Sequence, residues 1–428
     1  MSAEAHRATL RDLSERLVAA QRGIRILDAV AWDDGVREAF FASGCREAPR
    51  VDRAYYARRP LGFDPASTRD AFESLEREIL AKLGPSHPAG LIMVRMCREY
   101  ETVLAMLEAR GTPEFARFSA TLYGRSTDAL HPGQASLADL AALLDAALRS
   151  IDEHAFLEAA PRDIPTDRAV ALLQERLDRA FGPHGLQVKV RADDGIVADA
   201  AAGSDYIKLR AGTHFSERDL TALEVHEGWA HVGTTLNGRC QPVCTFLGKG
   251  TPSTTITQEG LALLVEVVSF ASHPKRLRRV TDRIRVIHQV EEGASFLEAF
   301  AALCDEGRTR EEAWGTCARV FRGSTPRAGP FSKDLAYSKG FVLVYNFIRL
   351  AVRRGRIDRI PLLFVGKVVL DEIGKLAELV EEGLVEPPRF LPPPFRDLSA
   401  LTAWMAYSNF LNRLDLDRVE ADFAHLLG

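Results

Sequence analysis

The stretch "ALEVHEGWAH", residues 222–231, carries the most informative pattern in this sequence. It contains His226, Glu227 and His231, so two histidines lie five residues apart with a glutamate directly after the first. The zinc-binding signature H-E-x-x-H places its two histidines four residues apart on one face of a helix. Here the interval is one residue longer, and the question is whether the two imidazoles still share one ion.

The residues before this stretch predict where its helix begins. Ser216 is a good N-cap, and Asp219 lies in capping-box position. Phe215 and Leu220 are placed as a hydrophobic staple. Residues five apart on a regular α-helix point roughly 140° apart, so the two imidazoles would not share an ion. A π-bulge would bring them back to one face. Since Gly228 lowers the cost of irregular backbone, we predict that the helix departs from α-form around it.

A second segment, "TPSTTITQEGLALLVE" (251–266), supplies a candidate third ligand. Its beginning, rich in hydroxyl groups and containing a proline, predicts a helix start. A hydrolytic zinc commonly takes two histidines and one glutamate, with water in the fourth position. Glu259 fits this role, because a carboxylate buried unpaired in apolar company would be costly. Glu266, seven residues further on, is the competing ligand. The alternatives are a surface glutamate favoured by the helix dipole and histidines that are merely hydrogen-bonded.

Composition and charge are those of an ordinary globular protein. The chain has 428 residues, is 46% hydrophobic and 27% charged, and has a formal net charge of −4. Nothing in this balance favours nucleic acid or an anionic membrane as a partner. The N-terminal "MSAEAHRATLRDLSERL" lacks the apolar centre of a signal peptide, and no run of apolar residues predicts a membrane span. The six scattered cysteines are typical of reduced thiols. We therefore expect a cytoplasmic location.

Helical periodicity dominates the chain, with one β-rich interval before the motif. Residues 1–155 are expected to form a helical N-terminal region. Three strands are predicted in "LQVKVRADD" (186–194), "GIVADAAAG" (195–203) and "YIKLR" (206–210). The chain is then helical up to a proline-rich stretch before a short helical tail. The sequence therefore predicts a mostly helical α+β fold, with a second domain over residues 156–428 whose small sheet directly precedes the motif helix.

The combination of "HEGWAH" (226–231) with "TQEGLA" (257–262) resembles the QEGLA-motif family. That family includes bacterial proteins labelled as flavohaemoglobin-expression modulators and eukaryotic microtubule-associated tyrosine carboxypeptidases. The resemblance also covers "LNGRCQP" (236–242) and "YSKG" (337–340). It spans roughly residues 160–350 and implies a gluzincin-like zinc peptidase, whose catalytic domain we expect over residues 156–428.

The same resemblance implies roles for individual residues. One Zn²⁺ per chain would be held by His226, His231 and Glu259, with Glu227 as general base. The expected reaction is hydrolysis of a peptide bond, with a peptide or protein C-terminus as the substrate of a carboxypeptidase. Tubulin is not carried over as the substrate, because its tails are acidic and this chain has no basic excess. Glu227 would take a proton from water and deliver it to the leaving amine.

Further residues are candidates for binding the substrate. Tyr337 is the candidate donor to a developing oxyanion, with Lys333 and Lys339 as alternatives. Arg210, at the end of "YIKLR", is the candidate to grip a substrate carboxylate, and this strand is predicted to be an exposed edge. Gln258 is a candidate to orient a ligand. An ordinary structural role is the alternative for Tyr337, Arg210 and Gln258. For the whole protein, the alternatives are a zinc hydrolase of a non-peptide substrate and a non-catalytic regulator that keeps the metal.

Overall fold

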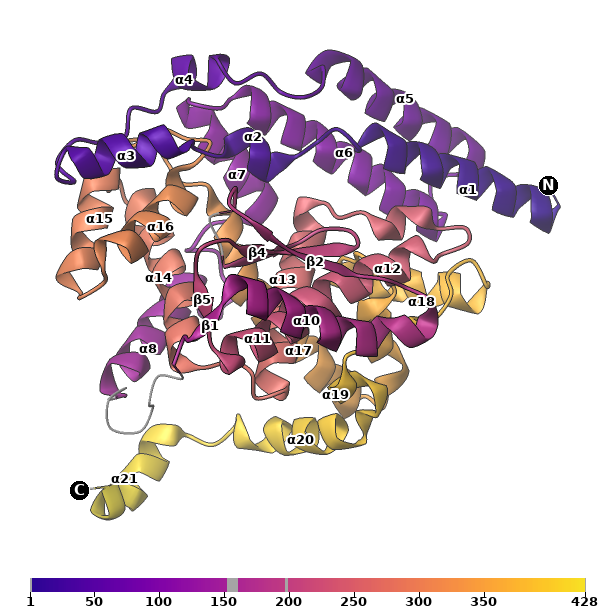
Figure 1. Cartoon of the computed structure of the whole chain (residues 1–428). Helices are drawn as coiled ribbons and strands as arrows, with labels where there is room; N and C mark the ends of the chain where they lie inside the picture. The colour runs from indigo at the N-terminus through magenta and orange to yellow at the C-terminus, as the bar shows by residue number, and fades with distance from the viewer. Residues whose placement is uncertain (1, 152–160, 197–198, 428) are drawn as a thin grey trace.

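The computed structural model describes residues 2–151, 161–196 and 199–427. Figure 1 shows that this part of the chain is mostly helical with a small β-rich part, as the sequence predicts. Helices α1 to α8 occupy most of the N-terminal region. Their bounds are α1 (Ala3–Ala20), α2 (Ile26–Val30), α3 (Asp34–Ala42), α4 (Arg53–Ala57), α5 (Pro65–Leu83), α6 (Pro88–Glu108), α7 (Pro113–Tyr123) and α8 (Leu137–Ser150).

The predicted strands form a three-stranded sheet whose order is β2-β4-β3. Its members are β2 (Lys189–Asp193), β3 (Ala200–Ala202) and β4 (Tyr206–Arg210). β2 runs parallel to β4, and β3 runs antiparallel to it. The prediction that "YIKLR" is an exposed edge is wrong, because this strand is β4 and has a hydrogen-bonded neighbour on each side.

A second, two-stranded sheet and one long helix frame the three-stranded sheet. β1 (Ile164–Pro165) pairs antiparallel with β5 (His214–Phe215) and so closes the β-rich interval. Between β1 and β2 lie α10 (Thr166–Phe181) and the short 3₁₀ helix η1 (Gly182–His184). α10 packs against β2 and against the segment that carries the motif.

The motif lies on a continuous helical stretch built from α11 (Glu217–Leu223), the π-helical segment η2 (Glu224–Val232) and α12 (Gly233–Arg239). Mostly helical chain follows it. The further helices are η3 (Thr245–Gly248), α13 (Pro252–Val268), α14 (Pro274–Glu291), α15 (Phe296–Asp305), α16 (Arg310–Phe321), η4 (Ser332–Leu335), α17 (Ala336–Arg353), η5 (Ile357–Phe364), η6 (Leu370–Glu372), α18 (Ile373–Glu381), α19 (Pro393–Arg396), α20 (Leu398–Leu411) and α21 (Leu416–Leu427).

Two glycines let α13 and α17 cross with their backbones in contact. A methyl group on Gly260 would lie 1.9 Å from the carbonyl carbon of Gly340, and one on Gly340 would lie 1.8 Å from the carbonyl oxygen of Ile256. Only glycine permits an approach this close. The glycines of "TQEGLA" and "YSKG" therefore bring Glu259 and Tyr337 together, since each motif residue lies within one turn of the crossing.

By length and composition alone, one described segment, Ser332–Arg353, could cross a membrane. This segment contains α17, whose residues Ala336, Gly340 and Val344 are buried at spacings of four, on the side that crosses α13. The apolar character of this face therefore follows from its place in the core.

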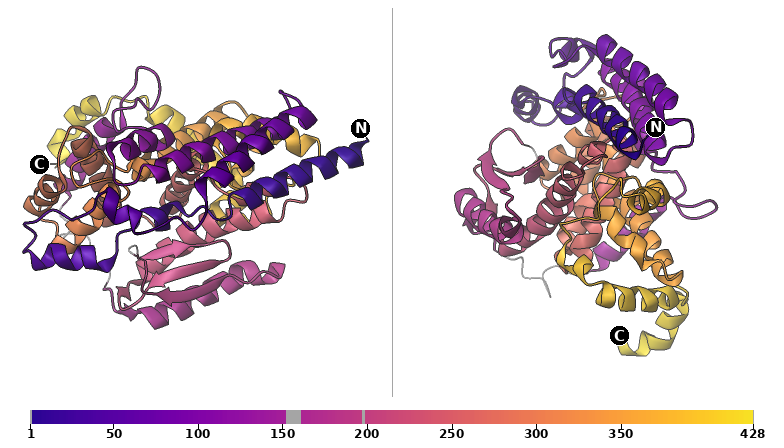
Figure 2. Two further views of the ribbon diagram at one scale, coloured as in Figure 1. Left: turned by 90° about the horizontal axis from the view of Figure 1, so that it is seen from above. Right: turned by 90° about the vertical axis from the view of Figure 1, so that its right-hand side faces the viewer.

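One core joins the N-terminal helices to the rest of the chain. The largest cluster of buried apolar side chains includes Leu13 and Leu104 from the N-terminal helices together with Phe246 and Leu264. The right-hand view of Figure 2 shows the N-terminal helices at the top, α10 and the sheets at the left and the C-terminal helices at the bottom. The division at residue 155 stays a prediction, and the apolar packing is continuous across it.

Candidate metal centre

Side chains from two separate helical segments, η2 and α13, meet at one point. His226, His231 and Glu259 each offer a ligand atom, and these atoms all lie within 4.8 Å of one another. Oε2 of Glu259 lies 3.6 Å from Nε2 of His226 and 3.4 Å from Nε2 of His231. Ligands about 2.0–2.1 Å from a tetrahedral zinc lie roughly 3.3 Å from each other, so the spacing suits such an ion.

The two histidines share a face because the backbone between them is π-helical. The predicted departure from α-form is confirmed, and it extends over the nine residues Glu224–Val232. Where this segment ends, the N–H of Gly233 bonds to the carbonyl of Gly228, five residues back. A ladder with this interval returns residues five apart to one face, which regular α-helix does not do. The capping box of Ser216 and Asp219 is also confirmed, with both hydrogen bonds formed.

Gly228 has a packing role inside the π-helical segment. A methyl group there would lie 2.7 Å from Cδ2 of Leu177 on α10. The glycine therefore lets α10 pack closely against the back of the motif.

Glu259 shows why this group suits a cation. It is only 8% exposed, and its Oε1 accepts from Nζ of Lys333 at 3.3 Å. Its Oε2, which faces both imidazoles, is buried and has no hydrogen-bond donor within the part of the chain that the structure describes. A buried carboxylate oxygen without a partner is costly. A divalent metal ion would satisfy this oxygen and both Nε2 atoms at once, so the residues present fit zinc.

The electrostatics of the group point the same way. Burial by itself would lower the pKa of His226, but the carboxylates of Glu259 and Glu266 outweigh it and raise this pKa to about 9. Burial would raise the pKa of Glu259, but Lys333 and the two histidines hold it well below its usual range. Without metal, a proton on His226 thus supplies positive charge beside the Glu259 carboxylate. A bound metal ion would supply this charge instead.

Glu266 is not a member of the ligand group, although the sequence made it the competing ligand. Its Oε1 lies 2.5 Å from Nδ1 of His226, and it forms a two-point ion pair with Arg276 of α14. Burial raises the pKa of Glu266, but Arg276 and His226 lower it to about 2, so it is ionised. An ionised carboxylate at Nδ1 fixes the proton there and leaves Nε2 free to face Glu259.

A half-buried lysine that sequence analysis missed connects the two helical segments of the site. Nζ of Lys367 donates to the carbonyl of His231 at 2.9 Å, to Oε1 of Gln258 at 2.9 Å and to Oγ1 of Thr234 at 3.1 Å. Gln258 is buried, and its Oε1 also accepts from Oγ1 of Thr234, so this oxygen binds the turn after His231. Its predicted role in orienting a ligand stays a prediction. Burial lowers the pKa of Lys367 to about 7. No spacing pattern marks this residue, because it lies far along the chain from both motifs.

Glu227 lies on the side of η2 that faces the sheet. Its Oε2 accepts from the backbone N–H of Ala202 at 3.1 Å. Ala202 belongs to β3, an outer strand of the sheet, which packs against η2. The bond occupies one carboxylate oxygen, and no hydrogen bond to Oε1 is found among the described residues.

Tyr337 lies beside the ligand group. Its ring is 6.4 Å from the ring of His226, centroid to centroid, and nearly parallel to it. Burial raises the pKa of its phenol above the ordinary value. Its hydroxyl forms no hydrogen bond within the described residues, and it therefore remains free to donate to a substrate. Of the two alternative donors, Lys333 is engaged by Glu259, and Nζ of Lys339 lies against Gly124 at the end of α7.

The structure does not bring Arg210 into contact with this group. It is exposed at the end of β4, and its backbone N–H donates to the carbonyl of Asp199. Within the described residues, its guanidinium forms no ion pair. Its role as the residue that grips a substrate carboxylate stays a prediction.

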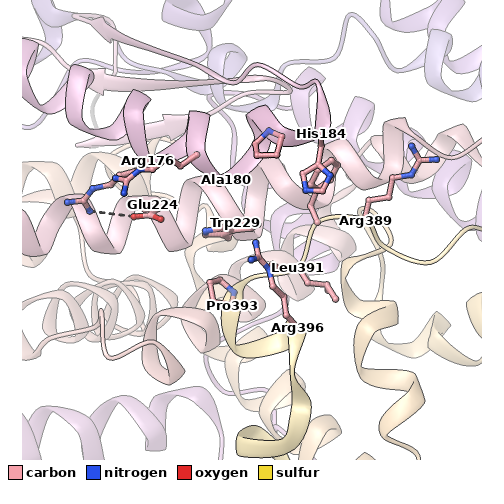
Figure 3. A pocket seen from close by; sticks show the side chains of 12 residues that line it. Arg176, Ala180, His184, Glu224, Trp229, Arg389, Leu391, Pro393 and Arg396 are labelled. Atoms are coloured by element: carbon pink, nitrogen blue, oxygen red, sulfur yellow. Dashed lines mark hydrogen bonds and ion pairs between the residues drawn. The ribbon is translucent and has the colours of Figure 1, made fainter.

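A large hollow lies on another side of the motif. Figure 3 shows this hollow, of about 940 Å³, with Glu224 and Trp229 of η2 and Arg396 among the residues that line it. The guanidinium of Arg396 lies 4.7 Å from the centre of the Trp229 ring. None of the three ligand residues lines the hollow, so it is not the metal centre.

Comparison with known proteins supports the resemblance to which the two motifs point. A family model described as microtubule-associated tyrosine carboxypeptidase matches residues 38–413, nearly the whole chain. The match extends well beyond residues 160–350, into helices where the sequence shows no recognisable motif. No curated protein matches the chain.

Proposed function

Because the chain belongs to the microtubule-associated tyrosine carboxypeptidase family, we propose that it is a zinc-dependent carboxypeptidase acting on the C-terminus of a peptide or protein. The observation that carries the proposal is the buried Oε2 of Glu259, which has no donor and faces Nε2 of both histidines. Three protein ligands are the number that a hydrolytic zinc takes, whereas a structural zinc takes four.

The chemistry divides between the metal and the chain. His226, His231 and Glu259 would hold the ion, which supplies Lewis acidity to the scissile carbonyl. Glu227 takes a proton from the attacking water as the new C–O bond forms, and it delivers a proton to the leaving nitrogen as the C–N bond breaks. Tyr337 donates its unoccupied O–H to the carbonyl oxygen as negative charge develops there.

The family description names the first substrate to test. A peptide that ends in tyrosine with a free carboxylate should lose that residue, because the family is described as a tyrosine carboxypeptidase. We propose no particular protein substrate, since the description concerns the family and not this chain.

The test is metal analysis of the purified full-length chain, followed by incubation with a mixed peptide library and mass spectrometry. We expect about one zinc per chain and products shortened from the C-terminus. Internal cleavage would instead make it an endopeptidase. If the protein binds zinc and cleaves no peptide, the proposed function is wrong, and a non-peptide hydrolase or a regulator takes its place.

A further inference from the structure

Arg283 on α14 is a partly buried cation that forms no hydrogen bond within the described chain. Its side chain is 19% exposed, and its nearest carboxylate oxygen within the described chain is Oδ2 of Asp334, at 3.6 Å. That carboxylate is already held at two points by Arg319, with Nε–Oδ2 at 2.7 Å and Nη2–Oδ1 at 3.3 Å. The guanidinium of Arg283 therefore has donors that no described residue accepts.

The surroundings of Arg283 carry an excess of positive charge. Arg283, Arg319 and Arg322 interact electrostatically with one another and share the carboxylate of Asp334, and the more distant Glu259 also acts on Arg319. Nε and Nη2 of Arg322 are buried and have no hydrogen-bond partner within the described chain. Burial and the neighbouring Arg319 lower the pKa of Arg283, because the extra charge is poorly compensated. Three guanidinium groups that share one nearby carboxylate leave positive charge only partly compensated. A further anion that binds there would therefore be favoured.

The arginines adjoin the metal centre through Tyr337. Cζ of Arg283 lies 5.4 Å from the centre of the Tyr337 ring, and that ring stacks beside the ligand His226. Lys333 also lies between the metal centre and Tyr337, since its Nζ donates to Glu259 and lies 5.8 Å from the centre of the Tyr337 ring. The Tyr337 ring thus lies between the guanidinium of Arg283 and the candidate ligand His226.

We propose that Arg283 binds the terminal carboxylate of the substrate, so that the enzyme recognises a free C-terminus. A guanidinium offers two parallel N–H groups that match a carboxylate. The added anion offsets the excess charge of the three arginines. It also sets the scissile bond at a fixed distance from Tyr337 and the metal ligands. Arg210, at the end of β4, is the rival for this role.

The inference rests on the proposed carboxypeptidase function, and the experiment separates the two. Two peptides of one sequence ending in tyrosine are compared, one with a free carboxylate and the other with a C-terminal amide. Activity is measured in the wild type and in Arg283→Gln, Arg283→Lys and Arg210→Gln. Arg279→Gln is the matched control, because Arg279 lies one turn away on α14 and pairs with Asp199 at 3.5 Å. Binding of both peptides is measured in a Glu227→Gln background, by calorimetry.

We expect the wild type to prefer the free acid. Arg283→Gln should lower kcat/KM for the acid by on the order of 10- to 100-fold, as removal of a hydrogen bond to a charged group does. It should leave kcat/KM for the amide peptide unchanged, and it should abolish the preference for the acid over the amide peptide in binding. Arg283→Lys keeps the positive charge but lacks the two parallel N–H groups, so it should retain part of the preference for the acid peptide. This variant replaces Arg283→Gln as the test if Arg283→Gln does not fold. Arg279→Gln should behave as the wild type.

Three results would overturn the inference: a wild type that treats acid and amide alike, an Arg283→Gln protein that keeps the full preference, or loss of the preference in Arg210→Gln instead. If the wild type cleaves neither peptide but binds the acid through Arg283, the inference holds and the carboxypeptidase function fails.

Discussion

At the residue scale, two glutamates of α13 take different roles although they lie seven residues apart. Glu259 and Glu266 are both buried, but only Glu259 faces the Nε2 atoms of the histidines. Glu266 meets His226 from the other side of its ring, at Nδ1, and Arg276 holds its charge. The imidazole of His226 thus lies between the candidate ligand Glu259 and the carboxylate of Glu266.

Glu266→Gln tests the orienting role. The amide keeps the size of the side chain but removes the charge that fixes the proton on Nδ1 of His226. We expect zinc affinity to fall by about 10- to 100-fold, which is typical when a group behind a metal-binding histidine is changed. A zinc titration against a competing chelator measures this. Glu259→Gln should lose zinc far more completely, and an unchanged affinity in Glu266→Gln would contradict the orienting role.

Glu227→Gln tests the base. The variant keeps one oxygen to accept the N–H of Ala202, and Glu227 is not in the ligand group, so the protein should fold and keep its zinc. Its peptidase turnover should fall by about 10²–10⁴-fold, as expected when a positioned general base is lost. Turnover and bound zinc are measured on the same preparation. An unchanged turnover would reject Glu227 as the base.

At the element scale, the site depends on where helices meet. The π-helical segment turns His226 and His231 to one side, and the crossing of α13 and α17 carries Glu259 and Tyr337 to the same place. Neither arrangement requires a loop to supply a ligand. The candidate metal ligands therefore lie on packed helices, whose positions the core determines.

Gly340→Ala tests the crossing. The added methyl group would meet the backbone of α13, which cannot rotate away as a side chain can. We expect the free energy of unfolding to drop by roughly 1–3 kcal/mol or more, the range for overpacked cores, and zinc binding to weaken with it. Denaturant unfolding measures the first effect. Gly315→Ala on α16 is the control, since nothing lies near its added methyl group, and it should stabilise the helix by about 0.5–1 kcal/mol. Equal behaviour of the two variants would show that the crossing tolerates a side chain.

At the scale of the whole molecule, the N-terminal helices hold the start of α13. Arg95 of α6 binds Glu372 at two points, with distances of 2.7 Å and 3.1 Å, and also bonds to Glu99. Glu99 in turn accepts from the hydroxyl and the backbone N–H of Ser253, in the first turn of α13. The helix that carries Glu259 is therefore anchored from residues far earlier in the chain.

A fragment tests whether the predicted division at residue 155 is a division between folding units. Residues 161–428 alone would expose the apolar surface that Leu13 and Leu104 cover, and would lose the contact of Glu99 with α13. We expect this fragment to show no cooperative thermal transition by circular dichroism and to bind no zinc. A fragment that unfolds cooperatively and binds zinc would establish two independent domains.

Local patterns determined a large part of this description. Capping residues marked the start of the motif helix, and the β-rich interval predicted before it holds the three strands of the larger sheet. The five-residue interval of the histidines predicted irregular backbone, because no regular α-helix brings both to one ion. These features depend on residues that are close together in the chain, so they can be recognised in the sequence.

Tertiary structure alone decided how distant residues combine. The sequence left Glu259 and Glu266 as competitors, because residues seven apart share a helical face and only the position of His226 distinguishes them. It also made "YIKLR" an edge, since alternation reveals a strand but not its neighbours. Lys367 and Arg283 escaped notice because the groups they meet lie on other elements, and such contacts are a property of packing. What the sequence determined by itself was the elements and the two motifs; their meeting at one candidate metal centre was decided by the crossing of α13 and α17.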